Sequence, residues 1–366
     1  MKMKLPLPKP PAKAQKKMSV AEMNKTLDQA SKNFRVAIFK GDYEEAYKKI
    51  LPAHQLLPQH PSILMDLAYT ELRLSKLELA YEHYTKAIKY SGAQVDTGIY
   101  DGLTEVCHFL GKTEECVQIG RLAIQTKKQM VANEPILKTI ETAPAPFNPK
   151  RPAENIIAFS LFGNLARYCE TSMINVDLVK EIYPEWACRF YVNETVTDLV
   201  KQRLIDKGAQ VVEVNEQQNQ LSGLFWRFFV MDDPTVKRFL IRDADSLVSY
   251  RERAVVDEWL GSNKWFHTMH DGYTHTELIL AGMWGGCHGV FANIEQLIHD
   301  FIQKGQFPNQ RVIDQHFLRF AIWPTLSQSV MIHDSQGFDH EGKKFHIPSK
   351  SKDYELLADF HVGMNE

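Results

Sequence analysis

Two kinds of hydrophobic pattern divide the chain. Over residues 24 to 126, apolar side chains recur at three- and four-residue spacing, which predicts amphipathic helices. The pattern itself recurs after about 34 residues, a period typical of helix-turn-helix repeats. The small residues Ala46 and Ala53 of one copy correspond to Ala80 and Ala87 of the next. A third, weaker copy around residues 111 to 123 contains Gly120. We expect these small residues where paired helices approach closely.

After residue 153 the pattern changes to an alternation of short apolar runs and helical segments. The runs lie at residues 155–162, 187–192 and 210–214, and the helical segments lie at 168–182 and 195–206. Strand, helix, strand, helix, strand predicts an α/β domain with a parallel sheet between layers of helices. Ligands of such sheets bind beyond the carboxyl ends of the strands.

The boundaries follow from composition. Residues 1–17 contain six lysines, four prolines and no acidic residue, so we expect a flexible basic tail. Prolines 144, 146, 149 and 152 predict an extended connector. The predicted organisation is a tail (1–23), helical repeats (24–127), a linker (128–153) and an α/β domain (154–366).

Composition excludes several classes of protein. With 43 basic and 45 acidic side chains the net charge is -2, so no global field attracts nucleic acid. Five cysteines occur without a Cys-x-x-Cys pair, which argues against a disulfide framework and a structural zinc module. No signal peptide and no run of about 18 apolar residues is present. We therefore expect a cytoplasmic protein, with at most peripheral contact to the inner face of a membrane.

The most informative polar residues are Asp243 and Asp245. They end a buried-strand pattern at residues 237–246, and side chains two residues apart on a strand point the same way. Two carboxylates at the end of a strand suit Mg²⁺ or Mn²⁺, which commonly bridges to substrate phosphates. Ser249 and Glu252 follow as a capping box that fixes the adjoining loop.

Further candidates lie downstream. Asp271 precedes a glycine, so it is either a turn residue or a carboxylate that faces a sugar substrate. The glycines at residues 282–286 allow either close approach of a ligand or tight packing. Asp314 and Gln315 open an apolar helix that we expect Pro324 to end. His333 follows the last strand pattern as a core or loop residue, or as a metal ligand.

The helical region resembles the tetratricopeptide repeat. Ala68, Ala80, Tyr84 and Ala87 match that repeat best. The resemblance implies an all-α domain whose concave face binds a peptide, a polymer or another subunit. The alternative is that the repeats only brace the following domain.

The second half resembles glycosyltransferases of the GT-A fold, and among them family 8-like bacterial enzymes of surface polysaccharide synthesis. The resemblance rests on the order of residues 241–246, 269–275, 281–285 and 314–318, and it covers residues 154 to 336. It implies a Rossmann-like, mostly parallel sheet.

The same resemblance implies roles for individual residues. Asp243 and Asp245 would bind the divalent metal on the diphosphate of a nucleotide sugar, with Arg242 beside them, and His333 would complete the metal shell. Tyr168 would stack on the base of the donor. Asp314 and Gln315 would lie near the reacting sugar carbon of a retaining enzyme.

The expected function is therefore a metal-dependent, retaining glycosyltransferase that uses a UDP-sugar and a glycan or lipid-linked glycan acceptor. An inverting reaction would need a carboxylate base, for which Asp271 is the candidate. The repeats would hold the acceptor, a protein partner or a second copy. The alternative is an inactive repeat-based adaptor, since the residues that follow the histidine in the family are absent after His333. A nucleotidyltransferase would need a glycine-rich loop, but residues 159–164 contain one glycine.

Overall fold

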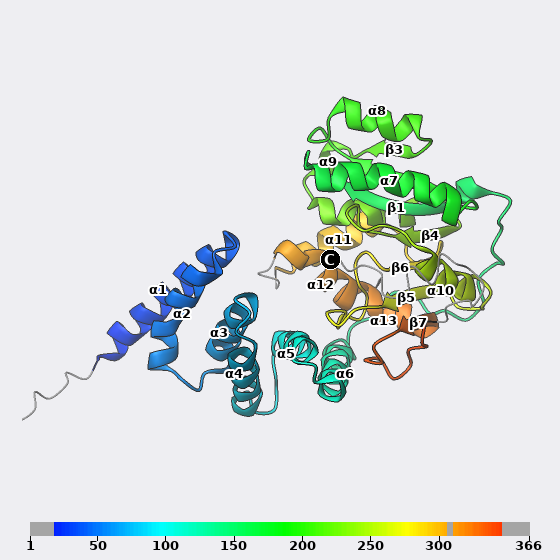
Figure 1. Ribbon diagram of the computed structural model, residues 1–366. Coiled ribbons are helices and arrows are strands. Elements are labelled where there is room, and N and C mark those ends of the chain that lie inside the picture. The colour runs from blue at the N-terminus through cyan, green and yellow to red at the C-terminus, as the bar shows by residue number, and fades with distance from the viewer. Residues whose placement is uncertain (1–17, 306–309, 346–366) are drawn as a thin grey trace, which may run out of the picture. The chain divides into compact units, whose positions relative to one another are not determined.

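The computed structural model describes residues 18–305 and 310–345, in two compact units that meet between Val106 and Cys107 (Figure 1). The predicted flexibility of residues 1–17 lies outside the described residues, as does the last part of the predicted α/β domain, from residue 346 onward. The predicted tail (1–23) extends too far, because a capped helix already begins at Val20. No helix among the described residues is long and apolar enough to cross a membrane.

The first unit is built from helical hairpins, as the repeat period predicts. Its helices are α1 (Val20–Phe39), α2 (Tyr43–Leu56), α3 (Pro61–Arg73), α4 (Leu77–Tyr90) and most of α5 (Thr97–Phe109). Side-chain caps at Ser19 and Asp42 begin α1 and α2 by accepting hydrogen bonds from free backbone N–H groups. Ala46, Ala80 and Ala87 are fully buried, so small residues allow the helices of each hairpin to pack closely.

The second unit contains a seven-stranded mixed sheet. Its strands are β1 (Asn155–Leu161), β2 (Ala187–Val192), β3 (Gln210–Glu213), β4 (Arg238–Ile241), β5 (Phe266–His270), β6 (Trp284–Cys287) and β7 (Val330–Asp334). They are arranged in the order β3-β2-β1-β4-β6-β5-β7. Only β6 runs antiparallel to its neighbours, so the sheet is largely parallel, as the alternating pattern predicts.

Helices cover the sheet, and the hydrophobic core of the unit lies between these helices and the sheet. The second unit contains α6 (Thr113–Met130), α7 (Ala166–Ile182), α8 (Asp198–Asp206), α9 (Glu216–Asn219), α10 (Tyr250–Leu260), α11 (Ile294–Gln303), α12 (Ile313–Phe317) and α13 (Trp323–Leu326). Val176 of α7 and Trp259 of α10 pack with Phe159 and Leu240 on one face of the sheet. A tight helical segment at Gly223–Asp232 lies against β1.

Two local predictions differ from the structure. Pro324 does not end a helix, because a wider turn at Leu318–Ile322 carries the chain from α12 into α13, where proline occupies the first turn and needs no N–H partner. Ser249 caps α10 as predicted, but the Glu252 side chain bonds Arg242 and Tyr183, so the structure shows one half of the predicted capping box.

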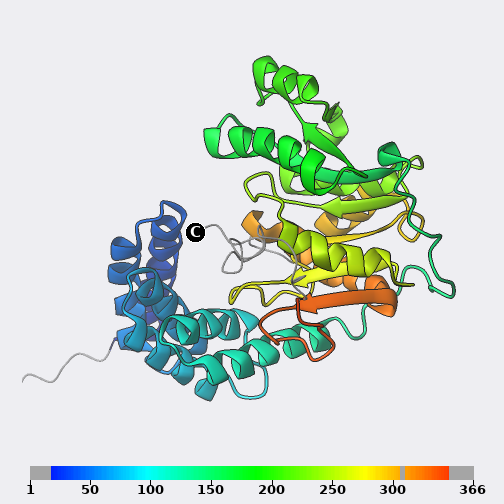
Figure 2. The same ribbon diagram turned by 45° about the vertical axis from the view of Figure 1, so that its right-hand side comes forward.

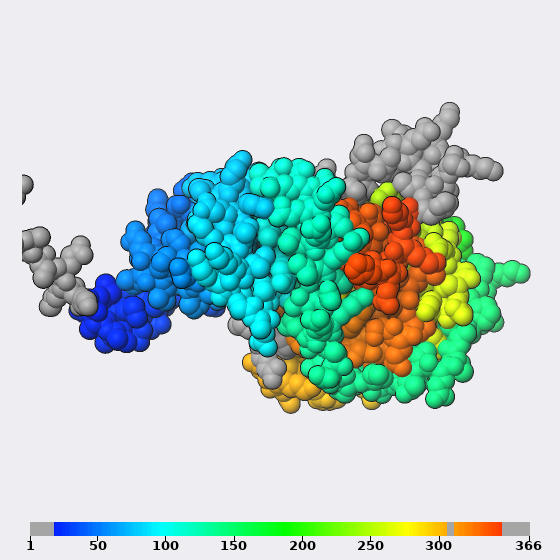
Figure 3. Space-filling view, turned by 90° about the horizontal axis from the view of Figure 1, so that it is seen from below, coloured from blue at the N-terminus to red at the C-terminus, as the bar shows by residue number. Residues whose placement is uncertain are grey.

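The last predicted repeat helix, α6, belongs to the same compact unit as the sheet. Arg121 Nε donates to the Gly337 carbonyl at 2.8 Å, and Lys128 pairs with Asp339 at 3.0 Å. A Cβ at Gly120 would overlap the ring of Phe338, so this glycine makes room for the segment after β7. Figures 2 and 3 show this segment, orange to red, alongside α6.

The proline-rich connector is extended and fastened along the sheet-containing unit. The Leu137 N–H donates to Thr325 Oγ1 at 2.8 Å, and Gln328 Nε2 donates to the Lys138 carbonyl at 2.9 Å. Trp265 Nε1 donates to the Thr142 carbonyl at 2.5 Å. The linker predicted at 128–153 is therefore part of a packed surface in the structure.

Ser75 provides a test of the repeat geometry. It has φ +57°, whereas the matched turn positions are Gly41 (φ +72°) and Gly111 (φ +68°). We expect Ser75→Gly to raise the free energy of unfolding by about 0.5–1 kcal/mol, because only glycine adopts this conformation without steric cost. Thermal unfolding of the full chain measures it. Ser91→Gly, at φ -71°, should give no gain, and equal stabilisation by both changes would contradict this explanation.

Candidate active site

The strand order reverses between β1 and β4, which marks the position where a ligand of this sheet is expected. Strands β2 and β3 are added next to one edge of β1, whereas β4 pairs with its opposite edge, so the direction of strand addition reverses between β1 and β4. Crevices at such reversals, beyond the carboxyl ends of the strands, are where α/β sheets bind ligands. Asp243 and Asp245, here called the acidic pair, directly follow β4 and therefore lie at this position.

A buried arginine joins the acidic pair to a distant helix. Arg227, whose side chain is 4% exposed, forms an ion pair with Asp243 through Nη1. Its Nη2 lies 3.0 Å from Oδ2 of Asp314 on α12. The Asp243 side chain is 47% exposed, whereas that of Asp314 is 5% exposed. One guanidinium therefore holds an accessible carboxylate and a buried carboxylate together.

The local structure fixes this arginine. Its backbone N–H donates to Ser160 Oγ of β1 at 2.9 Å, and the surrounding segment Gly223–Asp232 is almost entirely buried. Burial opposes its charge, but the carboxylates of Asp243 and Asp314 raise the pKa of Arg227 above its ordinary value. Burial, with the charge of Asp243, raises the pKa of Asp314 although Arg227 acts in the opposite direction.

Asp245 has a second arginine as its partner. Arg167, in the first turn of α7, lies 2.9 Å from Asp245 Oδ2, and its side chain is 58% exposed. Burial and the neighbouring charge of Asp243 raise the pKa of Asp245. Tyr168 follows Arg167, whose guanidinium carbon lies 5.9 Å from the tyrosine ring centroid. The predicted base-stacking residue is thus adjacent to the partner of the acidic pair.

The backbone before β6 closes against Asp243. The Ala281 N–H donates to Gln315 Oε1 at 3.1 Å, which fixes this segment to α12. A Cβ at Gly282 would overlap Oδ2 of Asp243, so glycine is required for this approach. Gly285 and Gly286 serve packing instead, since a Cβ there would meet Leu240 and Phe266 inside the sheet.

Two predicted site residues lie in the interior. Asp271 is fully buried, and its two oxygens accept from Nε and Nη2 of Arg251 at 2.7 Å each, so it does not face a substrate as a base. Arg242 donates through Nε to Glu252 at 3.2 Å and through Nη1 to the Trp284 carbonyl at 3.1 Å. Arg242 therefore holds α10 and β6 together and does not face a donor.

His333 also departs from its predicted role as a metal ligand. Its Nδ1 lies 2.8 Å from His267 Nε2, and its Nε2 lies 3.0 Å from a Glu258 carboxylate oxygen. The residue is fully buried, and burial lowers its pKa although Glu258 acts in the opposite direction. Because both ring nitrogens are engaged, His333 cannot complete a metal shell in this arrangement.

The acidic pair by itself fits a cation that arrives with a substrate. Within residues 18–305 and 310–345, no three His, Cys, Asp or Glu side chains are grouped so as to hold a metal ion. Mg²⁺ commonly uses only one or two protein carboxylates, with substrate phosphates and water as further ligands. Burial and, after it, repulsion by Asp243 raise the pKa of Asp245, and a bound cation would offset that repulsion.

Two site residues, Arg227 and Arg167, were not among those predicted from the sequence. Arg227 is the single charged residue within the apolar run at residues 224–231, and a charge in such a run indicates a buried partner. That signal could have identified it. Arg167 has no comparable signal, because it lies on an exposed helix turn and its partner is distant in sequence.

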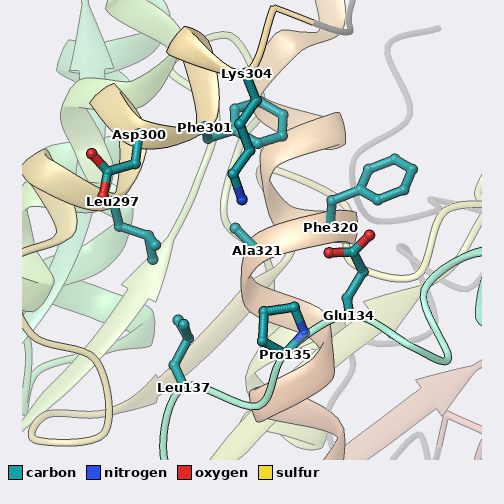
Figure 4. Close-up of a pocket in the computed structure, with 9 residues that line it drawn as sticks. All are labelled: Glu134, Pro135, Leu137, Leu297, Asp300, Phe301, Lys304, Phe320 and Ala321. Atoms are coloured by element: carbon teal, nitrogen blue, oxygen red, sulfur yellow. The ribbon is translucent and has the colours of Figure 1, made fainter.

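A separate small cavity, of about 80 Å³, lies between the connector and α11. Figure 4 shows Lys304 reaching toward Ala321, with Phe301 and Leu137 among the apolar lining residues. Ligand pockets usually enclose roughly 300–1,000 Å³, so this cavity cannot hold a nucleotide sugar.

The comparisons with known proteins give limited information. No model of a known protein family matches the chain, and no curated protein matches it in sequence. Among solved structures, a mutant of the Thermobaculum terrenum O-GlcNAc transferase is 13% identical over 56% of this chain, with a TM-score of 0.31. This chain spans 44% of that transferase.

The second TPR domain of human RPAP3, in complex with an HSP70 peptide, is 18% identical. That match covers 28% of this chain and 85% of the domain, with a TM-score of 0.27. TM-scores this low do not establish a shared fold, so the assignment of helical repeats followed by a mixed-sheet α/β domain rests on the elements described above.

Gly282→Ala tests the close approach to Asp243. We expect a loss of about 1–3 kcal/mol in the free energy of unfolding, because the new methyl group displaces a paired carboxylate. Denaturant unfolding measures it. Gly261→Ala is the matched control, since its Cβ meets nothing nearer than a backbone oxygen at 3.5 Å. Equal stability of the two variants would show that the approach is not tight.

Asp271→Asn tests whether this carboxylate is structural. Removing it leaves Arg251 buried without a charged partner, for which we expect a loss of about 3–5 kcal/mol in unfolding free energy. Asp177→Asn, which breaks an exposed pair with Lys207, should change stability by less than about 1 kcal/mol. A stable Asp271→Asn protein that lacks activity would instead restore the role of Asp271 as a base.

Proposed function

We propose that the α/β unit is a glycosyltransferase of the GT-A type that takes a nucleotide-sugar donor. The observation that carries the proposal is the acidic pair beyond the carboxyl end of β4, where the strand order reverses, with Asp243 joined through Arg227 to Asp314. Paired carboxylates at this position suit a cation-diphosphate group. The order of sequence motifs described above supports the same conclusion.

The chemistry of sugar transfer assigns roles to the residues of this chain. Breaking the bond between the anomeric carbon and phosphate leaves negative charge on a nucleoside diphosphate. A divalent cation, when bound, neutralises such charge as it develops. Asp243 and Asp245 would hold Mn²⁺ or Mg²⁺, while Arg227 holds the Asp243 carboxylate in position. The exposed guanidinium of Arg167 is available to a phosphate once it leaves Asp245.

The position of the other carboxylates favours a retaining reaction. An inverting enzyme needs a carboxylate base near the acceptor hydroxyl. Asp271 cannot serve, because both of its oxygens are bound to Arg251 in the interior. In this proposal Asp314 and Gln315 act through Arg227 and Ala281 and position the site.

The identity of the substrates rests on resemblance. We infer a UDP-sugar donor, a glycan or lipid-linked glycan acceptor, and a role in bacterial surface polysaccharide synthesis. The helical repeats would hold the acceptor, a protein partner or a second copy of the chain.

A second candidate function is a repeat-based adaptor that lacks activity. The observation in its favour is that Asp243 and Asp245 each pair with an arginine while His333 is engaged elsewhere. In an adaptor these arginines would permanently replace the cation.

Asp243→Asn and Asp245→Asn, assayed separately, test the proposed activity. With Mn²⁺ and a panel of nucleotide sugars, we expect wild-type protein to release nucleoside diphosphate. Each variant should lose about 10²–10³-fold in rate, the typical effect of removing one group that stabilises developing charge. Asp206→Asn, on the exposed side of α8, is the control and should keep full activity.

The adaptor makes the opposite prediction. It requires that no donor is hydrolysed and that no nucleoside diphosphate raises the thermal unfolding temperature of the wild-type protein. That result would overturn the proposed transferase.

A further inference from the structure

A fully buried lysine from α6 lies at the base of the loop that carries Gly282. Lys127 has no exposed surface, and its Nζ donates to the Thr276 carbonyl at 2.8 Å. The same nitrogen lies 3.3 Å from a carboxylate oxygen of Glu277. Both contacts are to the loop at residues 271–283, between β5 and β6. This loop ends at the backbone that closes against Asp243.

The same carboxylate also binds the helix that carries Asp314. Arg319 donates through Nε to Glu277 at 3.1 Å and also pairs with it through Nη2. Arg319 lies in the turn that directly continues α12. Although burial opposes ionisation, Lys127 and Arg319 lower the pKa of Glu277. The carboxylate is therefore the common anchor of α6, the loop and the α12 segment.

From Glu277, two routes lead to the acidic pair. Along the loop, Ala281 is fixed by Gln315 and Gly282 touches Asp243. Along the helix, Asp314 holds Arg227, and Arg227 holds Asp243. The Lys127–Glu277–Arg319 triad therefore supports both the backbone at Gly282 and the guanidinium of Arg227. These two groups fix the Asp243 carboxylate.

The charge of Lys127 is not needed for packing. Apolar side chains of similar volume commonly fill such a position at equal or greater stability, because burying charges is costly. In some proteins, buried ionic groups select one arrangement among several. Here the arrangement that they select is the position of the 271–283 loop.

We propose that Lys127 is a positioning residue of the acidic site, which holds the 271–283 loop and thereby Gly282 and Asp243 in their working arrangement. The proposal rests on the transferase function proposed above. It gives one residue of α6 a role in supporting the site, although the sequence assigns this helix to the repeats.

Lys127→Met and Arg319→Met test the proposal, alone and together. Each single change leaves Glu277 with one cationic partner, so each protein should fold. We expect Lys127→Met to lower kcat by roughly ten- to hundredfold, the scale of a small misplacement of reacting groups, while KM for the donor changes less than about threefold. The double variant leaves Glu277 buried without a cationic partner, so its loss should exceed that of either single variant.

A second measurement does not depend on activity. Hydrogen exchange at the amides of Ala281 and Met283 should be faster in Lys127→Met than in wild type. Lys128→Met is the matched control, because Lys128 lies on the same helix as Lys127. The variant loses the pairs with Asp339 and Glu341, which lie after β7, and should leave kcat and the exchange of these amides unchanged.

The outcomes separate the two proposals. Unchanged kcat in Lys127→Met, or an equal loss in Lys128→Met, would mean that Lys127 only fastens α6. If wild-type protein hydrolyses no donor, the transferase proposal fails, and the exchange rates alone decide whether Lys127 positions the loop. Unchanged exchange at Ala281 and Met283 would overturn it.

Discussion

The arrangement of the site depends on one buried charge, the guanidinium of Arg227. A lone buried cation is very costly, so Arg227 must have carboxylate partners, which come from the segment after β4 and from α12. If either carboxylate moved away, the buried guanidinium would lose a charged partner. The position of Asp243 is therefore tied to that of Asp314. The rest of the site is built around this constraint, including the glycine at position 282 that leaves room for the carboxylate.

Buried ion pairs also fix parts of the α/β unit other than the acidic pair. Glu277 satisfies Lys127 and Arg319, and Asp271 satisfies Arg251. These buried ion pairs join helices to the loops that follow the strands, where backbone groups have no regular partners. Hydrophobic packing alone is tolerant of small shifts, whereas bidentate pairs such as Arg251–Asp271 fix both distance and orientation. A set of loops is thereby held in one arrangement beside the carboxyl ends of the strands.

Asp243 and Asp245 differ in a way that bears on function. Asp243 pairs with the buried Arg227 and is itself half exposed, whereas Asp245 pairs with the exposed Arg167. An ion pair with one exposed partner is screened by water on that side, so it is weaker than a fully buried pair. The pair therefore combines one fixed carboxylate with one whose partner can be displaced by a competing cation or phosphate.

The sequence by itself determined the elements and their class. Helical periodicity gave the repeat hairpins, alternation gave the α/β unit, and the acidic pair fell at the end of β4, because these features depend on the local pattern of apolar side chains. Only the tertiary structure decided which polar groups meet. Asp271 is buried against Arg251, and His333 is buried between His267 and the exposed Glu258. Arg227 became central to the site, although the neighbouring sequence does not indicate which residues it pairs with. Ion pairs form between side chains that distant elements bring together, and their register is set by the packing of the whole unit.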